Sequence, residues 1–445
     1  MFFRTVALRF LPAVLLLLTA CSESSTKTET NASSAAEETM ATSADAIDSS
    51  QSALPDTATT TTTAAPRPNR LTASDTAYAQ DVALFLGGQQ PSQHSNLTQL
   101  AAQPGWQAFA KDQDKSWANY RATHTTRMTT WAGTELDSVH RSSPTIFYPF
   151  SGPDFLNVVT MFPTSQTYVL MGLEPVGSVP ARTSLENPKL FPAVKASLWS
   201  VLNFSFFRTN DMAVDLKSVE LDGALPLMML FAVRTGNQIT AIRPVQLDAT
   251  GKLVDAPTDT TQAADPKTVP GVEMKLRGPD GQPKTVYYFS ADLSDWKLNA
   301  KSAPLQFVRT LGPLTTYVKS ASYLMHKAYF NQVRRLVLRR SRYILQDDSG
   351  IAMKYFQKGA WQFNYYGTYR RPINLFAKHY QPELTAAYRD ILRKPKALPF
   401  GTGYNWRQTD SNLLLSRRLV PLADEPSRNN RLKGPWWQHH GPLPF

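Results

Sequence analysis

The chain has 445 residues, of which 42% are hydrophobic and 18% charged, and it carries a net charge of +12. This length and apolar content are sufficient for a sizeable core and permit more than one subdomain. The only cysteine is Cys21, so an internal disulfide, an iron–sulfur cluster and cysteine-ligated zinc are excluded.

Residues 1–20 have the composition of a signal peptide. Arg4 and Arg9 provide a positive start, and a short apolar run then leads to small residues, the order that a secretory signal requires. A transmembrane helix needs about 20 apolar residues. Only eleven residues separate Arg9 from Cys21, so this alternative does not fit.

The motif Leu18-Thr19-Ala20-Cys21 resembles the lipobox at which bacterial lipoproteins are cut and lipidated. The resemblance implies that Cys21 becomes a lipid-carrying N-terminus, and several acyl chains anchor more firmly than one. Ser22, rather than an aspartate, follows the cysteine. In the Gram-negative sorting pattern, such a residue implies the outer membrane, with the rest of the protein facing the periplasm.

Residues 21–70 are predicted to be a disordered tether. They are rich in Ser, Thr and Ala and carry a net charge of −4. Such a segment has too little apolar surface to offset the entropy of ordering. A spacer between the membrane and the domain explains the composition, and glycosylation of the Ser/Thr run is the alternative.

The remaining chain divides by charge into residues 71–300, with a net charge of −3, and residues 301–445, with +17. We expect a domain of α+β class, and its length permits two subdomains that meet near residues 255–300. The predicted elements of the first part follow in chain order: a helix over 74–86, a strand over 145–148, a helix over 155–161 capped by Asp154, a strand over 166–173, a helix over 190–204, a buried helix or strand over 224–233, a strand over 239–247, an exposed loop or joint over 254–284 and a strand over 286–292.

In the second part, apolar residues at helical spacing predict a long helix over 320–345. Its arginines fall mostly outside the apolar stripe; they are Arg334, Arg335, Arg339, Arg340 and Arg342. The sequence Asp347-Asp348-Ser349-Gly350 has strong turn chemistry. Alternation over 361–366 predicts a strand, and 384–392 predicts a short helix.

Several segments resemble stretches of bacterial proteins of unknown function. These are residues 148–155, 168–175, 344–351, 400–404 and 411–415. The resemblance is scattered over residues 145–415 and matches no enzyme family. It therefore implies no activity, cofactor or catalytic residue.

Candidate catalytic residues are few. Ser151 and Asp154 lie on a predicted turn that lacks the glycines of a nucleophile elbow, so a helix cap explains them more simply. Asp347 and Asp348, with His326, are the candidates for acid–base work, although adjacent carboxylates in a strand would face opposite ways. The sequence has no phosphate-binding glycine loop or metal-binding histidine pair, and we expect no cofactor or metal.

Two functions follow from these features. The basic residues of the last third, interleaved with aromatic rings, favour a non-catalytic protein that binds an anionic envelope partner: anionic lipid, lipopolysaccharide or peptidoglycan. The five arginines named above are the candidate contacts, and export makes nucleic acid an unexpected partner. The alternative is a periplasmic hydrolase that acts on an envelope polymer through Asp347 or Asp348 with His326.

Overall fold

The computed structural model describes residues 73–142, 144–204, 219, 221–257, 267–390, 392 and 394–422. Within these residues, helices and one ten-stranded mixed sheet form a domain of α+β class, as the sequence predicts. The predicted signal peptide, Cys21 and the tether lie outside the described residues. No helix among those described is long and apolar enough to cross a membrane.

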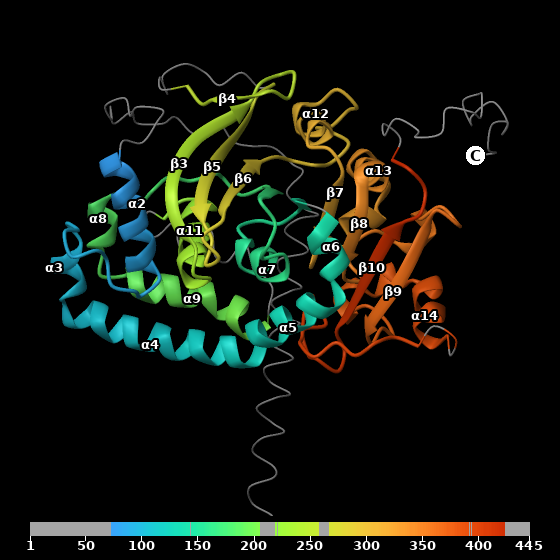
Figure 1. Ribbon diagram of the computed structural model, residues 1–445, viewed down its shortest axis with the longest axis horizontal. Helices are drawn as coiled ribbons and strands as arrows, with labels where there is room; N and C mark the ends of the chain where they lie inside the picture. Colours follow the sequence, from blue (N-terminus) through green and yellow to red (C-terminus); the bar gives the residue numbers. More distant parts are fainter. Residues whose placement is uncertain are drawn as a thin grey trace, which may run out of the picture. The chain divides into compact units, whose positions relative to one another are not determined.

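The strands lie in the order β4-β3-β5-β6-β2-β1-β7-β8-β10-β9. Figure 1 labels the strands on the two sides of this sheet, β3 to β6 on one side and β7 to β10 on the other. Their bounds are β1 Thr145–Pro149, β2 Thr167–Gly172, β3 Gln238–Leu247, β4 Leu253–Asp255, β5 Val269–Arg277, β6 Pro283–Ser290, β7 Leu314–Val318, β8 Ser341–Gln346, β9 Trp361–Gly367 and β10 Asn412–Arg418. The sheet takes strands from both sides of residue 300.

Helices precede, connect and follow these strands. They are α2 Ala73–Leu86, α3 Thr98–Ala101, α4 Pro104–Tyr120, α5 Thr126–Glu135, α6 Asp137–Ser142, α7 Phe155–Met161, α8 Arg182–Leu185, α9 Leu190–Phe204, α11 Leu225–Arg234, α12 Ala303–Thr310, α13 Asn331–Arg340 and α14 Pro382–Arg389. A π-helical turn over Arg121–Thr125 joins α4 to α5.

The centre of the sheet is parallel and its two sides are antiparallel. Strands β6, β2, β1, β7 and β8 pair in parallel, whereas β3, β4 and β5 on one side and β10 and β9 on the other pair antiparallel. Every residue of β1 and β7 is buried, as expected for parallel strands covered on both faces. Successive side chains alternate between faces: Ile146 and Tyr148 join one apolar cluster and Phe147 joins the other.

The two faces carry different helices. Buried residues of α2, α4, α5, α7, α9 and α11 belong to the first cluster, and those of α12 and α13 belong to the second. The chain places β2 and β6 on one side of β1 and then returns to place β7 and β8 on the other side. Helix α7 follows β1 onto one face, while α13 follows β7 onto the opposite face. The sheet therefore has a topological switch point between β1 and β7. Open α/β sheets bind ligands at such a point, just outside the carboxyl ends of the strands.

The prediction of one helix over 320–345 was wrong. The structure has an irregular loop, two 3₁₀ turns at Leu324–His326 and Ala328–Phe330, helix α13 and then strand β8. The apolar stripe is real for Val333, Leu336 and Val337, which α13 buries. Residues 341–346 instead join the sheet, because their β-formers can be buried on both faces between β7 and β10.

The predicted loop over 254–284 was also partly wrong, because β5 lies within it. Val272, Met274 and Leu276 are buried there, and β5 is hydrogen-bonded between β3 and β6. Prolines at 270 and 283 lie near the ends of strands, where a missing N–H is tolerated. The predicted helices that became α2, α7, α9 and α14 and the predicted strands β1, β2, β3, β6 and β9 are confirmed, and residues 225–234 form a buried helix.

Candidate functional site

Two loops leave the carboxyl ends of β1 and β7 at the switch point. Within the described residues, positive φ occurs at four non-glycine positions, and all four lie in these loops: Phe150 (58°), Ser320 (51°), Ser322 (47°) and Tyr323 (51°). Each such residue costs about 1–3 kcal/mol and persists only where its surroundings hold it. Backbone strain is therefore concentrated at the edge where the topology places a ligand site.

The loop after β7 is held by hydrogen bonds from both sides. The Ser320 N–H donates to Asp347 Oδ2 at 2.8 Å, and the Ala321 N–H donates to Ser349 Oγ at 2.8 Å. The Tyr404 hydroxyl donates to the Ser320 carbonyl at 2.8 Å. These contacts come from the turn after β8 and from the segment before β10, so two distant parts of the chain fix one strained loop.

A buried ion pair joins the two loops across the switch point. Lys319 Nζ lies 3.1 Å from Asp154 Oδ2, and the two side chains are 1% and 2% exposed. Asp154 also accepts hydrogen bonds from the Tyr148 hydroxyl at 2.9 Å and from the Asn157 N–H at 3.1 Å. The predicted role of Asp154 as the cap of the following helix is confirmed, and the ion pair adds a tertiary role.

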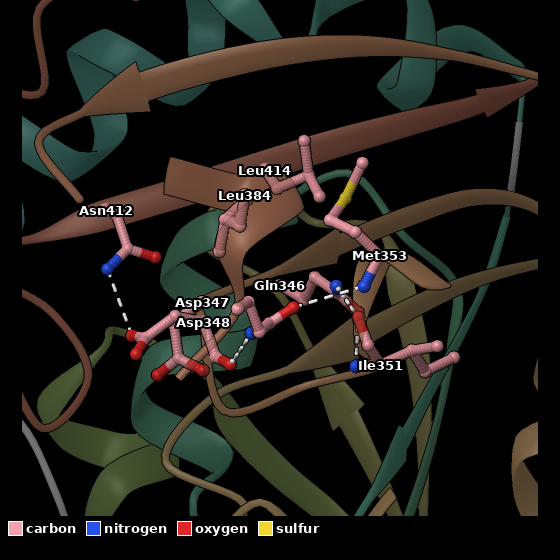
Figure 2. A pocket seen from close by; sticks show the side chains of 9 residues that line it. Gln346, Asp347, Asp348, Ile351, Met353, Leu384, Asn412 and Leu414 are labelled. Carbon is pink, nitrogen blue, oxygen red and sulfur yellow. Dashed lines mark hydrogen bonds between the residues drawn. The ribbon is translucent and has the colours of Figure 1, made fainter. Parts of the chain in front are cut away.

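Asp347 and Asp348 line the same narrow pocket, as Figure 2 shows. Adjacent carboxylates diverge in a strand, but these residues lie in a turn after β8, as the sequence predicts. Asp347 Oδ1 accepts hydrogen bonds from the Ser349 N–H and hydroxyl at 2.9 and 2.5 Å. Asp348 accepts from Asn412 Nδ2 at 3.0 Å and from the Tyr323 hydroxyl.

Burial changes the proton affinity of both acids. Burial and, to a smaller extent, the neighbouring Asp347 raise the pKa of Asp348 to about 7, although the hydrogen bonds from Tyr323 and Asn412 oppose this rise. Burial also raises the pKa of Asp347, although the hydrogen bonds from Ser349 and Ser320 oppose this. Asp348 can therefore exchange a proton near neutral pH, which is the property that acid–base catalysis requires.

The pocket beside these acids combines a polar end with an apolar wall. Its lining comprises Gln346, Asp347, Asp348, Ile351, Met353, Gln381, Leu384, Asn412 and Leu414. In Figure 2 the two carboxylates and Asn412 lie at one end, and Met353 and Ile351 lie toward the other. The space is too narrow to hold a water molecule, so the acids are shielded from solvent in this structure.

His326 joins the acids through Tyr323. The Tyr323 ring, whose hydroxyl donates to Asp348, contacts the rings of His326 and His379 with centroids 5.0 and 5.1 Å away. Burial, followed by the effect of His379, lowers the pKa of His326 to about 3. The imidazole is therefore neutral near pH 7.

The other sequence candidates have internal partners. The Ser151 hydroxyl donates to the carbonyls of Gly152 and Met171 at 3.0 and 3.2 Å, which suits a turn. Arg334 is buried and donates to the carbonyls of Met325 and Lys327, so its proposed contact with a partner must be withdrawn.

The remaining arginines differ in exposure. Arg340 donates to the Arg309 carbonyl at 2.9 Å and is half-buried, as is Arg342. Arg335 and Arg339 are exposed on α13. Of the five candidate contacts, these two present their charge fully to solvent.

Sequence reasoning missed Lys319, Ser320, Tyr323 and Asn412. The sequence does contain a signal for the end of a strand here. The apolar, threonine-rich segment 314–318 is followed directly by Lys-Ser-Ala-Ser. The prediction of a helix that starts near Ser320 concealed this signal.

In the described part of the chain, no group of three His, Cys, Asp or Glu side chains could hold a metal ion.

Comparisons of the chain with protein-family models, curated proteins and solved structures found no match. The site must therefore be interpreted from its own geometry.

Proposed function

We propose that the domain is a hydrolase whose active site lies at the switch point between β1 and β7. Asp348 is its general acid and base, and Asp347 is the second carboxylate of the pair. The observation that carries this proposal is the placement of a carboxyl with a pKa of about 7 beside strained loops at the carboxyl edge of the parallel strands.

The partners of the two acids support catalysis over a purely structural role. Asp348 accepts hydrogen bonds from the neutral side chains of Tyr323 and Asn412. Neutral partners in a dry environment leave the acid able to keep its proton to near neutrality. Groups with such a shift cluster at catalytic sites.

The proposal is tested with the full chain in detergent and a panel of chromogenic p-nitrophenyl esters, phosphates and glycosides. One member of the panel should be hydrolysed, and Asp348→Asn should reduce the rate by about 10²–10⁴-fold, the usual contribution of a positioned acid or base. Activity should fall as the pH rises above about 7, because Asp348 then loses the proton that it donates.

Asp81→Asn is the matched control. Asp81 is also buried and accepts two hydrogen bonds, from the Ser92 N–H at 2.8 Å and the Ser92 hydroxyl at 2.9 Å, but it lies on α2. This variant should retain the wild-type rate. Absence of hydrolysis across the panel, or equal rates for Asp348→Asn and wild type, would refute the proposal.

We also propose that lipid on Cys21 holds this hydrolase at the outer membrane, facing the periplasm, where an envelope polymer would be within its reach. The support is the lipobox-like sequence alone. Cys21→Ser should abolish palmitate incorporation and release the protein from the membrane fraction.

Arg335 and Arg339 remain candidate contacts for anionic lipid, lipopolysaccharide or peptidoglycan. Replacing both by Ala should weaken salt-dependent retention of the protein on anionic vesicles or sacculi.

A further inference from the structure

We infer that the stacked rings of Trp296 and Tyr329 bind a sugar ring of the substrate, and that this substrate is a glycan with carboxylate groups. The inference rests on the proposed hydrolase function and names the substrate class and the surface that holds it. The two rings are called the aromatic platform below.

Trp296 presents a large ring to solvent on a rigid support. The residue is 61% exposed, and its ring stacks on that of Tyr329 with centroids 4.5 Å apart and planes 16° apart. Stacking of this kind covers one face of the indole and fixes its orientation. The surface that remains for a ligand is therefore flat and aromatic.

The loops that carry the two rings are tied together by Asp295. Its N–H donates to the Tyr329 carbonyl at 2.7 Å, and its carboxylate accepts from the N–H groups of Asn331 and Gln332 at 3.0 and 2.8 Å. Asp295 thereby holds the residue next to it, Trp296, against the start of α13. A platform fixed in this way loses little conformational entropy when a ligand binds.

The aromatic platform lies at the carboxyl edge of the parallel strands. Trp296 belongs to the loop after β6, and Tyr329 belongs to the segment between β7 and α13. The same segment carries Tyr323, whose hydroxyl donates to Asp348. One connection of the fold therefore contributes both to the platform and to the environment of the proposed acid.

A sugar ring suits this surface better than a protein or a bilayer does. The C–H groups on one face of a sugar pack against the negative face of an aromatic ring. One ring face is far smaller than the roughly 800 Å² that each partner contributes to a protein interface. Insertion into a bilayer requires a broad apolar face, whereas the charged residues Asp295 and Lys297 flank Trp296.

The charges beside the aromatic platform favour an anionic glycan. Lys297 directly follows Trp296 and is exposed. Lys327 Nζ lies 5.6 Å from the centroid of the Tyr329 ring. Ammonium groups at the edges of a stacking surface attract carboxylates on the sugar that occupies it.

The positive charge continues from the platform toward the acids. Burial, followed by the charges of Lys327 and Lys378, lowers the pKa of His379 to about 4. The His379 ring stacks on that of Tyr323, with centroids 5.1 Å apart, and Tyr323 donates to Asp348. A carboxylated chain bound at Lys327 would thus extend toward the residues that surround Asp348.

The experiment measures binding to the full chain in detergent by isothermal titration calorimetry. The probes are hyaluronan hexasaccharide, in which every second sugar carries a carboxylate, chitohexaose, which has sugars without carboxylates, and hexaglutamate, which has carboxylates without sugars. Hyaluronan hexasaccharide should bind most tightly, because it alone satisfies both the rings and the lysines.

Trp296→Ala should weaken binding of hyaluronan hexasaccharide by about 10-fold, the size of the loss when a stacked ring loses its aromatic partner. Trp296→Phe should retain most of the affinity, because a flat ring remains. Trp199→Ala is the matched control: Trp199 is 51% exposed on α9, which packs on the opposite face of the sheet. This variant should bind as the wild type does.

Equal affinities of Trp296→Ala and wild type would overturn the aromatic platform. So would a loss of retention on phosphatidylglycerol vesicles in place of a loss of sugar binding, since this would identify a lipid surface as the partner. If the platform fails while p-nitrophenyl substrates are still hydrolysed through Asp348, the hydrolase proposal stands. If the hexasaccharide binds through Trp296 but no member of the panel is hydrolysed, the sugar-binding surface stands and the hydrolase proposal fails.

Discussion

Two buried carboxylates of the domain, Glu273 and Asp348, have contrasting partners, and the difference separates a structural cluster from a candidate site. In the antiparallel side of the sheet, Glu273 on β5 is bound by Arg243 at 2.9 Å and Lys275 at 3.1 Å and accepts from Tyr287 at 3.0 Å. Burial raises the pKa of Glu273, but these hydrogen bonds outweigh it and lower the pKa overall. At the switch point, Asp348 has neutral partners and its pKa rises to about 7.

Both acids are nearly inaccessible, so burial alone does not distinguish them. The sign of the pKa shift does: hydrogen bonds from Arg243 and Lys275 lower the pKa of Glu273, whereas burial and Asp347 raise the pKa of Asp348 by more than its neutral donors lower it. Strain adds a second distinction, because the non-glycine residues with positive φ in the described chain all lie beside the switch point.

The largest expected difference is in the free energy of unfolding when the cation that pairs with a buried carboxylate is removed. Lys319→Met leaves Asp154 buried without its counter-charge and should lower the free energy of unfolding by about 3–5 kcal/mol. Arg243→Met should cost about 1 kcal/mol or less, because Arg243 is 30% exposed and Lys275 still neutralises Glu273. Urea unfolding at pH 7.5, followed by tryptophan fluorescence, measures both. Equal losses would show that the two ion pairs do not differ in kind.

The second difference concerns the sign of the pH dependence. An unfolded aspartate ionises near pH 3.9, whereas native Asp348 keeps its proton to about pH 7. Between these values the unfolded chain binds fewer protons, so this residue lowers the free energy of unfolding by up to about 1.4 kcal/mol per pH unit as the pH rises. Asp348→Asn should remove that slope.

Glu273→Gln should show the opposite trend. The lowered pKa of Glu273 means that its contribution to stability is present above its unfolded pKa and is lost as the pH falls. The variant should therefore be most destabilised relative to wild type near neutral pH. Urea titrations at pH 4.5, 5.5, 6.5 and 7.5 compare the two variants, and slopes of the same sign would contradict the assignment of the two settings.

The smallest expected effect concerns strain. Ser320→Gly should raise the free energy of unfolding by about 1 kcal/mol, since glycine adopts positive φ without steric cost. Ser138→Gly, at an exposed position of α6, should instead lower it by about 0.5 kcal/mol. A loss of stability in Ser320→Gly would mean that the loop is not strained at that residue.

The sequence predicts the fold better where structure is local than where it depends on partners. Helix α7 and its Asp154 cap follow from adjacent residues, and the structure has both. Strand β8 could not be recognised, because the residues before it continue a helical stripe and its pairing with β7 and β10 is nonlocal.

The site follows the same rule. Asp347, Asp348 and His326 were identified as candidates, but no local pattern brings Lys319 to Asp154 or Asn412 to Asp348. The positive φ of Ser320 also has no sequence signal, since glycine is the residue that ordinarily marks such a position. These contacts depend on the order of strands in the sheet.

The hydrogen bond from Asn412 to Asp348 has a consequence for synthesis. Among the described residues, Asn412 begins the last strand in chain order, β10, while Asp154 belongs to the loop after the first strand, β1. A ribosome that has made the parallel centre of the sheet has therefore not yet made every group that holds the acids. Chains that stop before residue 412 can contain both aspartates and Ser320, yet Asp348 would lack its amide partner and β8 its antiparallel neighbour.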